Sequence, residues 1–180
     1  SILKISYLSN LMEEKGIFQL LDSLKDLENK QIHYEAKIAG NIDVNLKDII
    51  LEKILKLKHT TYVGVVYNNE KRTLLNWSNI FVLPTFYKME GQPISILEAL
   101  ATNNVIISTK HAGITDIVEE NKNGYLVEKK KSQSITNKFI YLDENKSKIL
   151  DISKYNKKYF TKNFTIEIFS KEIIKIIKEN

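Results

Sequence analysis

Two glutamates with seven residues between them lie in the stretch from Pro84 to Ala101, which reads PTFYKMEGQPISILEALA. Glu90 directly precedes Gly91, and Glu98 falls in the second turn of a helix that we expect to begin near Pro93. At about 1.5 Å of rise per residue, Glu98 lies roughly 7 Å along the helix axis from that proline. Carboxylates accept paired hydrogen bonds from vicinal hydroxyls. The two glutamates therefore suit a ligand that carries sugar hydroxyls at two positions.

The segment between the glutamates has the features of an anion site. Gly91 lets a ligand approach the backbone closely, and Pro93 at the first helical position sacrifices no hydrogen bond. The helix N-terminus that follows offers free N–H groups and the positive end of a dipole, which suits a diphosphate. Each glutamate alone also admits a structural interpretation. Glu90 could stabilise the helix end electrostatically, and Glu98 could be a solvated helix residue.

The elements that must position these residues alternate between strands and helices. Apolar runs predict strands at 2–8, 33–39, 60–63, 80–83, 105–108 and 125–127. Helical spacing predicts helices at 16–27, 44–57, 70–77, 94–102 and 113–118. After residue 131 the pattern is only helical, and the last helix, 164–177, has apolar positions at Ile166, Phe169, Ile173, Ile174 and Ile177.

This alternation predicts an α/β fold, a Rossmann-like, doubly wound parallel sheet with helices on both faces. Ligands of such sheets bind beyond the carboxyl ends of the strands. The loops to search are therefore 10–15, 40–43, 64–69, 84–93 and 109–115.

The stretch 84–101 resembles the block P-S-x-x-E-G-x-P-x-x-x-L-E-A-M-A of retaining glycosyltransferases with the GT-B fold, particularly glycosyltransferase family 4. Further matches follow the same order along the chain. Residues 7–16, YLSNLMEEKG, are similar to the family's G-R-L-x-x-x-K-G, and Val63-Gly64-Val65 resembles its short strand and glycine. AGITDIV at 112–118 and NGYLV at 123–127 resemble G-G-x-x-E-I-V and N-G-x-L-V. The resemblance covers essentially the whole chain as the C-terminal half of a GT-B fold.

The resemblance implies a role for each matching residue. The first glutamate of the motif, Glu90, would position the donor sugar, and the second, Glu98, would hold the ribose hydroxyls. Lys15 would neutralise the diphosphate. The backbone at Gly91, Gln92, Pro93 and Ile94 would face sugar and phosphate, and Asn10 and Gly64 would belong to the same donor site.

One departure from the family pattern concerns the phosphate side of the site. Asn10 stands where the family often has an arginine, and Ser9 where it has a glycine. Because an amide replaces a charge-assisted contact, we expect weaker diphosphate affinity. Asp116, where glutamate is commoner, is a milder change.

The implied function is that of a donor-binding domain. Residues 1–180 would form one nucleotide-sugar-binding domain, taking UDP-sugar or GDP-sugar without a metal or other cofactor. The chain begins directly before an apolar run, so we expect an N-terminal acceptor domain upstream of it. That domain would bind a polysaccharide or lipid-linked acceptor, and this chain alone would be inactive. The parent would be a hexosyltransferase-type enzyme of bacterial surface or capsular polysaccharide synthesis.

Two alternatives stay open. One is another GT-B enzyme that uses nucleotide sugars, such as an epimerase or an inverting transferase. The other is a non-enzymatic Rossmann-like interaction module.

The amino-acid composition narrows the range of other possible functions. The net charge is +5, but it comes almost wholly from scattered lysines with a single arginine, Arg72, which disfavours nucleic-acid binding. Lys129 to Lys131 is the one short basic run, and we expect it to be solvated. His111 lies in a loop at the ligand-binding edge and could face the ligand. With no cysteine and no HExxH, no metal site is expected, and the cytoplasm, or the inner face of its membrane, is the expected location.

Overall fold

A six-stranded parallel sheet forms the centre of the computed structural model. The structure describes residues 2–179, except for the side chains of residues 172, 173 and 176–179. The strands stand in the order β3-β2-β1-β4-β5-β6. They are β1 (Leu3–Leu8), β2 (Tyr34–Ala39), β3 (Thr60–Gly64), β4 (Ile80–Leu83), β5 (Val105–Thr109) and β6 (Gly124–Val127). This order is that of a doubly wound Rossmann-like sheet, so the predicted fold class is confirmed.

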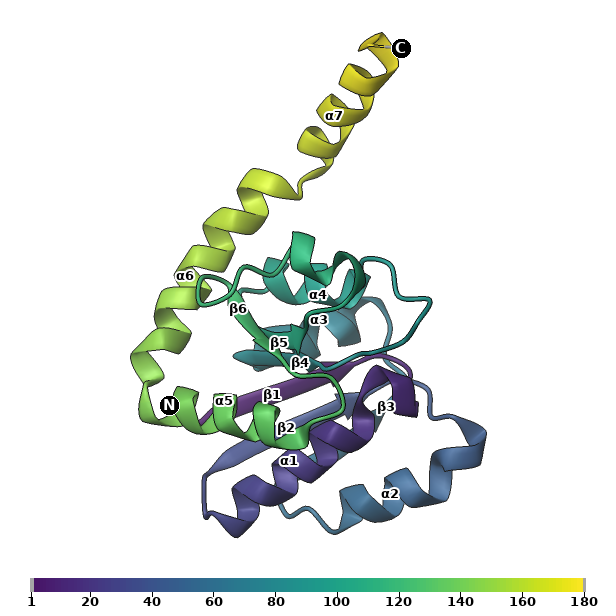
Figure 1. Cartoon of the computed structure of the whole chain (residues 1–180), viewed down its shortest axis with the longest axis vertical. Helices are drawn as coiled ribbons and strands as arrows, with labels where there is room; N and C mark the ends of the chain where they lie inside the picture. The colour runs from purple at the N-terminus through teal and green to yellow at the C-terminus, as the bar shows by residue number, and fades with distance from the viewer. Residues whose placement is uncertain (1, 180) are drawn as a thin grey trace.

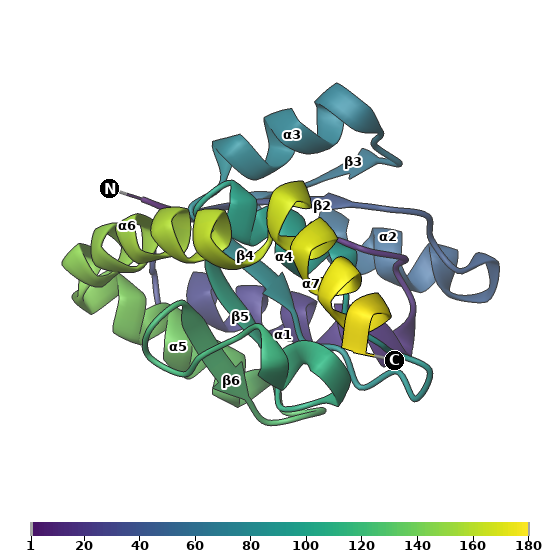
Figure 2. The ribbon, with the colours of Figure 1, turned by 90° about the horizontal axis from the view of Figure 1, so that it is seen from above.

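Helices cover both faces of the sheet (Figures 1 and 2). On one face α1 packs against α5 and α2, and on the other α4 packs against α6, with α3 beside it. Their bounds are α1 (Ile17–Asn29), α2 (Lys47–Leu55), α3 (Asn68–Trp77), α4 (Ile94–Ala101), α5 (Ser132–Glu144) and α6 (Lys146–Asn163). The central strands are buried from both sides, and every residue of β4 and β5 is buried. Their continuous apolar runs are the pattern expected of parallel strands covered by helices.

Three predicted helices begin differently from the expectation. The Asp43 carboxylate accepts a hydrogen bond from the Asn45 N–H at 3.0 Å, and a 3₁₀ turn, η2 (Val44–Leu46), precedes α2. Helix α3 starts before Glu70 because the Glu70 carboxylate accepts from the Tyr67 N–H at 3.2 Å, which stabilises an earlier first turn. The segment predicted at 113–118 is a 3₁₀ helix, η3 (Ala112–Asp116).

The last helix, α7 (Ile166–Glu179), extends away from the rest of the molecule (Figure 1). Three of its predicted apolar positions are exposed, Ile166 at 81%, Phe169 at 68% and Ile174 at 51%. The other two, Ile173 and Ile177, have side chains outside the described residues. The described part of α7 therefore presents apolar side chains to solvent.

Candidate functional site

The carboxyl ends of β1 and β4 lie side by side at the centre of the sheet, and the chain leaves them toward opposite faces. The β1–α1 loop (9–16) and the β4–α4 loop (84–93) meet here. The Phe86 N–H donates to the Glu14 carbonyl at 2.8 Å. Gly16 has a φ of +77°, and a Cβ on it would lie 2.4 Å from the Pro84 carbonyl oxygen. Only glycine allows the two loops to approach this closely.

The Tyr7 side chain, near the end of β1, holds the backbone of the β1–α1 loop. Its fully buried hydroxyl donates to the Asn10 carbonyl at 3.0 Å, with the Lys15 carbonyl 3.5 Å away. Burial raises the pKa of Tyr7, so the hydroxyl remains a neutral donor. The sequence analysis did not single out this residue, whose signal was a tyrosine near the end of a predicted strand.

Lys15 and Glu90 form an ion pair between the two loops. The Lys15 Nζ lies 2.8 Å from the Glu90 Oε2, and the side chains are 14% and 8% exposed. The same oxygen accepts a hydrogen bond from the Thr85 hydroxyl at 2.9 Å. The Lys15 Nζ also lies 4.9 Å from the centre of the Tyr87 ring. A cation and a carboxylate that sequence places far apart are thus held together at the switch point of the sheet.

The N-terminus of α4 opens beside this pair. Helix α4 begins at Ile94, as the predicted range 94–102 has it, and Pro93 is its N-cap and not its first helical residue. No side chain caps this end. Gly91, Gln92 and Ile94 are exposed, and a Cβ on Gly91 would meet no atom within 4 Å. The space over the helix end is therefore open, and the first N–H groups of α4 can donate hydrogen bonds to an anionic ligand.

Glu98 lies apart from the Lys15–Glu90 pair, on the flank of α4 that faces α3. It forms an ion pair with Lys71 of α3, and the two side chains are 31% and 32% exposed. They border a surface groove of about 370 Å³ between α3 and α4, which Asn68 and Arg72 also line. Glu98 is thus neither a freely solvated residue nor a buried one.

Residues 3–159 match the model of the family described as glycosyl transferases group 1. The chain belongs to this family. It is 22% identical over 189 residues to the putative colanic acid biosynthesis glycosyltransferase WcaL of Escherichia coli, covering 98% of this chain and 45% of that protein. It is 24% identical over 169 residues to the capsular polysaccharide biosynthesis glycosyltransferase CapM of Staphylococcus aureus, covering 94% of this chain and 44% of that protein. The chain therefore spans about half the length of these relatives.

Solved structures show the same fold. HepE of Anabaena in complex with UDP and glucose superposes with a TM-score of 0.85 at 17% identity, over 99% of this chain and 49% of that one. The C-terminal domain of the group 1 protein LpcC of Francisella tularensis gives 0.79 at 22% identity, over 91% of this chain and 87% of that one. The expected Rossmann-like, C-terminal half of a GT-B fold is confirmed.

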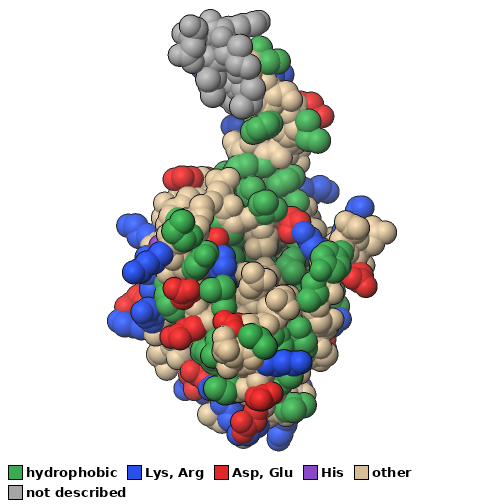
Figure 3. Space-filling model, turned by 90° about the vertical axis from the view of Figure 1, so that its right-hand side faces the viewer, with side chains coloured by type: hydrophobic (Ala, Val, Ile, Leu, Met, Phe, Trp, Pro, Cys, Tyr) green, Lys and Arg blue, Asp and Glu red, His purple; other side chains and the backbone are tan. Residues whose placement is uncertain are grey.

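The other candidate residues of this group 1 chain lie further from the ion pair. Asn10 is exposed in the β1–α1 loop, and the structure records only backbone hydrogen bonds for it. Gly64 ends β3, which β2 separates from β1, and its carbonyl accepts from the Gly40 N–H at 2.9 Å. The candidate residues in loops therefore follow the carboxyl ends of β1, β3 and β4. On the side of the molecule shown in Figure 3, charged and apolar side chains are mixed.

Residues 129–131 are exposed, as expected of a solvated run, but Lys129 also makes a side-chain contact. Its Nζ lies 2.8 Å from the His111 Nδ1, because β5 and β6 pair in parallel and their last residues, Thr109 and Val127, lie side by side. His111 in turn contacts the backbone of Tyr87. Lys129 is therefore connected through His111 to the β4–α4 loop.

No cluster of His, Cys, Asp and Glu side chains that could hold a metal ion occurs among the described residues. Over the same residues, no helix combines the length and the apolar character that a membrane span requires.

Proposed function

We propose that the edge formed by the β1–α1 and β4–α4 loops binds the donor of a retaining glycosyltransferase of family 4, a UDP-sugar or a GDP-sugar, without a metal or cofactor. The observation that carries the proposal is the Lys15–Glu90 pair beside the uncapped N-terminus of α4. A cation and free N–H groups suit a diphosphate, and a neighbouring carboxylate suits the hydroxyls of the attached sugar. The complex of HepE with UDP and glucose, a protein of the same fold, supports this assignment.

Lys15 is assigned to the diphosphate and Glu90 to the donor sugar. In the structure the two side chains neutralise each other at 2.8 Å. When a diphosphate binds, the ammonium of Lys15 turns to it, and the Glu90 carboxylate becomes available for sugar hydroxyls. The Thr85 hydroxyl, 2.9 Å from the carboxylate, keeps it oriented during this exchange.

Glu98 is assigned to the ribose, which requires Lys71 to release or share the carboxylate. Because this pair is about one-third exposed, solvent screening makes the exchange inexpensive. The backbone of Gly91, Gln92, Pro93 and Ile94 completes the phosphate and sugar contacts. Asn10, in place of a cation, and Gly64, at the end of β3, complete the wall of the site.

Sugar transfer also requires groups that orient the acceptor. We propose that an N-terminal domain supplies them and binds a polysaccharide or lipid-linked acceptor, since this chain spans about half the length of its relatives. The diphosphate leaving group gains negative charge as the glycosidic bond breaks, and Lys15 and the α4 N-terminus would stabilise it. The names of WcaL and CapM support a role in surface polysaccharide synthesis, and we propose that the group transferred is a hexosyl.

The domain alone should bind nucleoside diphosphates but transfer no sugar. Ligand-observed NMR and calorimetry with UDP, GDP, UDP-glucose and GDP-mannose test the binding half, and product analysis with the same donors tests the transfer half. Binding should be weak, because one wall of the cleft is supplied by the other domain. Transfer by the isolated domain would contradict the two-domain account, and anomeric inversion by the full-length enzyme would contradict the retaining assignment.

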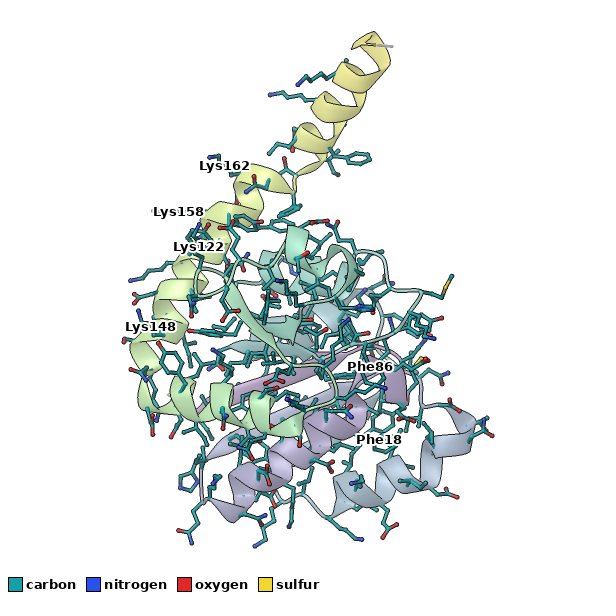
Figure 4. All side chains as sticks on the ribbon, viewed as in Figure 1. Phe18, Phe86, Lys122, Lys148, Lys158 and Lys162 are labelled. Carbon is teal, nitrogen blue, oxygen red and sulfur yellow. The ribbon has the colours of Figure 1, made fainter. Side chains whose placement is uncertain are left out.

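We also propose that the parent enzyme works in the cytoplasm, peripherally at the inner face of the membrane. Helix α6 carries exposed lysines at helical spacing, Lys154, Lys158 and Lys162. Figure 4 shows two of them, Lys158 and Lys162, on the side of α6 that points away from the sheet. Each lysine near an anionic surface contributes about 1 kcal/mol of attraction. The domain should therefore sediment with phosphatidylglycerol vesicles and not with phosphatidylcholine vesicles.

The matched variants for that experiment carry the same change in net charge. K154E/K158E/K162E should lose vesicle binding, whereas K25E/K47E/K58E, with exposed lysines on and beside α1 and α2, should keep it. Equal sedimentation of the two triple variants would show that α6 does not face the membrane.

A further inference from the structure

His111 lies where three loops meet, and its ring is held at both nitrogens. It is the N-cap residue of η3, in the loop after β5. The Nε2 atom lies 2.7 Å from the carbonyl oxygen of Tyr87 in the β4–α4 loop. The Nδ1 atom lies 2.8 Å from the Nζ of Lys129 in the loop after β6.

These two partners determine the protonation state of the ring. A carbonyl oxygen can only accept a hydrogen bond, so Nε2 must carry a proton and donate it to Tyr87. A lysine ammonium can only donate, so Nδ1 must present its lone pair to Lys129. His111 is therefore a neutral imidazole in the Nε2–H tautomer.

Other contacts join the same loops at neighbouring points. The Gly113 N–H donates to the Gly91 carbonyl at 3.1 Å, and the Thr109 hydroxyl donates to the Thr85 carbonyl. The Nζ of Lys130 lies 4.8 Å from the centre of the Phe86 ring, which Figure 4 shows on the side of the molecule where β1 ends. The loops after β5 and β6 thus hold the β4–α4 loop on both sides of Glu90.

Glu90 needs such support when a ligand arrives. Its carboxylate has two side-chain partners among the described residues, Lys15 at 2.8 Å and the Thr85 hydroxyl at 2.9 Å. If Lys15 turns to a diphosphate, Thr85 remains as the side-chain partner of Glu90. The position of the loop then depends on its backbone contacts, of which the His111 bond at Tyr87 lies closest in sequence before Glu90.

We propose that His111 is a positioning residue for the donor sugar. Its neutral ring fixes the β4–α4 loop, and with it the Glu90 carboxylate, and it holds the Lys129 ammonium at the margin of the site. The identity of the ligand rests on the proposed function, but the tautomer and the loop contact do not. His111 acts through Glu90, so it should affect sugar-bearing ligands more than free nucleotide.

Replacement of His111 by glutamine and by alanine tests this role. A glutamine amide can donate to the Tyr87 carbonyl with its NH₂ group and accept from Lys129 with its oxygen. His111→Ala can do neither. We expect His111→Ala to weaken nucleotide-sugar binding about fivefold, the value of one hydrogen bond, and to leave nucleoside diphosphate binding within about twofold. His111→Gln should restore most of the loss, and Lys129→Met should give a smaller loss than His111→Ala.

Two ligand-independent measurements separate a failure of this inference from a failure of the proposed function. Nitrogen-15 spectra of the free domain should show His111 as a single Nε2–H tautomer. His111→Ala should also shift the backbone amides of residues 86–91, which the control Lys53→Ala should leave in place. A Nδ1–H tautomer, unmoved amides, or an alanine variant that binds nucleotide sugar as wild type does would each overturn the inference. If wild type binds no nucleotide sugar, the proposed function is wrong, and the positioning role for a donor sugar is overturned with it even where the loop contact is found.

Discussion

Lys15→Ala should weaken binding of a nucleoside diphosphate by roughly tenfold or more, because a charge-assisted hydrogen bond contributes about 1.5–3 kcal/mol. Lys15 is the cation at the switch point of the sheet, and its side chain is only 14% exposed. Asn10, at the position of the family's arginine, offers no second charge in the same loop. The loss should therefore appear in full in a calorimetric titration with UDP or GDP.

Lys53→Ala is the matched control for this change. Lys53 also forms an ion pair with a carboxylate at 2.8 Å, that of Asp22, but between α1 and α2 and with side chains that are 42% and 53% exposed. The two variants remove the same chemical group and the same charge. Identical titration curves for Lys15→Ala and Lys53→Ala would place the phosphate site elsewhere.

Loss of Lys15 also leaves the Glu90 carboxylate without its cation, at 8% exposure. Thermal unfolding should therefore accompany the titrations. In the double variant Lys15→Ala/Glu90→Gln the unpaired charge is removed, so its stability should exceed that of Lys15→Ala while its affinity for free nucleotide stays low. This result separates a lost phosphate contact from a distorted loop.

Substitutions of the two glutamates should weaken ligand binding in different ways. Glu98 is assigned to the ribose, which free nucleotide and nucleotide sugar share, so Glu98→Ala should weaken both ligands by the same factor, about tenfold. Glu90 is assigned to the sugar, so Glu90→Gln should leave free nucleotide within about twofold and remove most of the additional affinity of the sugar-bearing ligand. In the full-length enzyme, Glu90→Gln should lower kcat more than it changes nucleotide affinity.

Substitution of Lys71, the ion-pair partner of Glu98, provides a control for Glu98→Ala. Lys71→Met removes the cation that competes for the Glu98 carboxylate in the free domain, so it should strengthen ribose binding slightly or leave it unchanged. If Glu90→Gln weakens free nucleotide as strongly as Glu98→Ala does, the division of roles between the two glutamates is wrong.

The sequence predicted the elements of the fold because each leaves a local pattern. Runs such as 80–83 and 105–108 have the length and β-branched content of buried parallel strands, and both are strands in the structure. Helix starts were less predictable. The carboxylates of Asp43 and Glu70 bind nearby backbone N–H groups, and these bonds set the first turns of two helices more strongly than the spacing of apolar residues does.

For the candidate site, too, the sequence predicted the features that a local pattern marks and not those that depend on distant contacts. Local motifs singled out Lys15, Glu90 and Glu98, but spacing alone could not show that the first two form a pair. The contacts that orient them join distant positions: Lys71 lies on a different helix from Glu98, and Lys129 reaches His111 from another loop. Such contacts follow from sheet order and loop packing, which no short pattern encodes.

The most direct test of the proposed donor site is to locate the bound nucleotide on the domain. Changes in the backbone amide chemical shifts of the isolated domain give this location. On titration with UDP or GDP, we expect the largest shifts at Lys15, at Gly91 and at the first residues of α4, Ile94 and Ser95. The groove at the opposite end of the sheet, which His33 and His59 line, should not respond. Shifts confined to that opposite end, or no shifts at millimolar nucleotide, would contradict the claim that the carboxyl edge between β1 and β4 binds the donor.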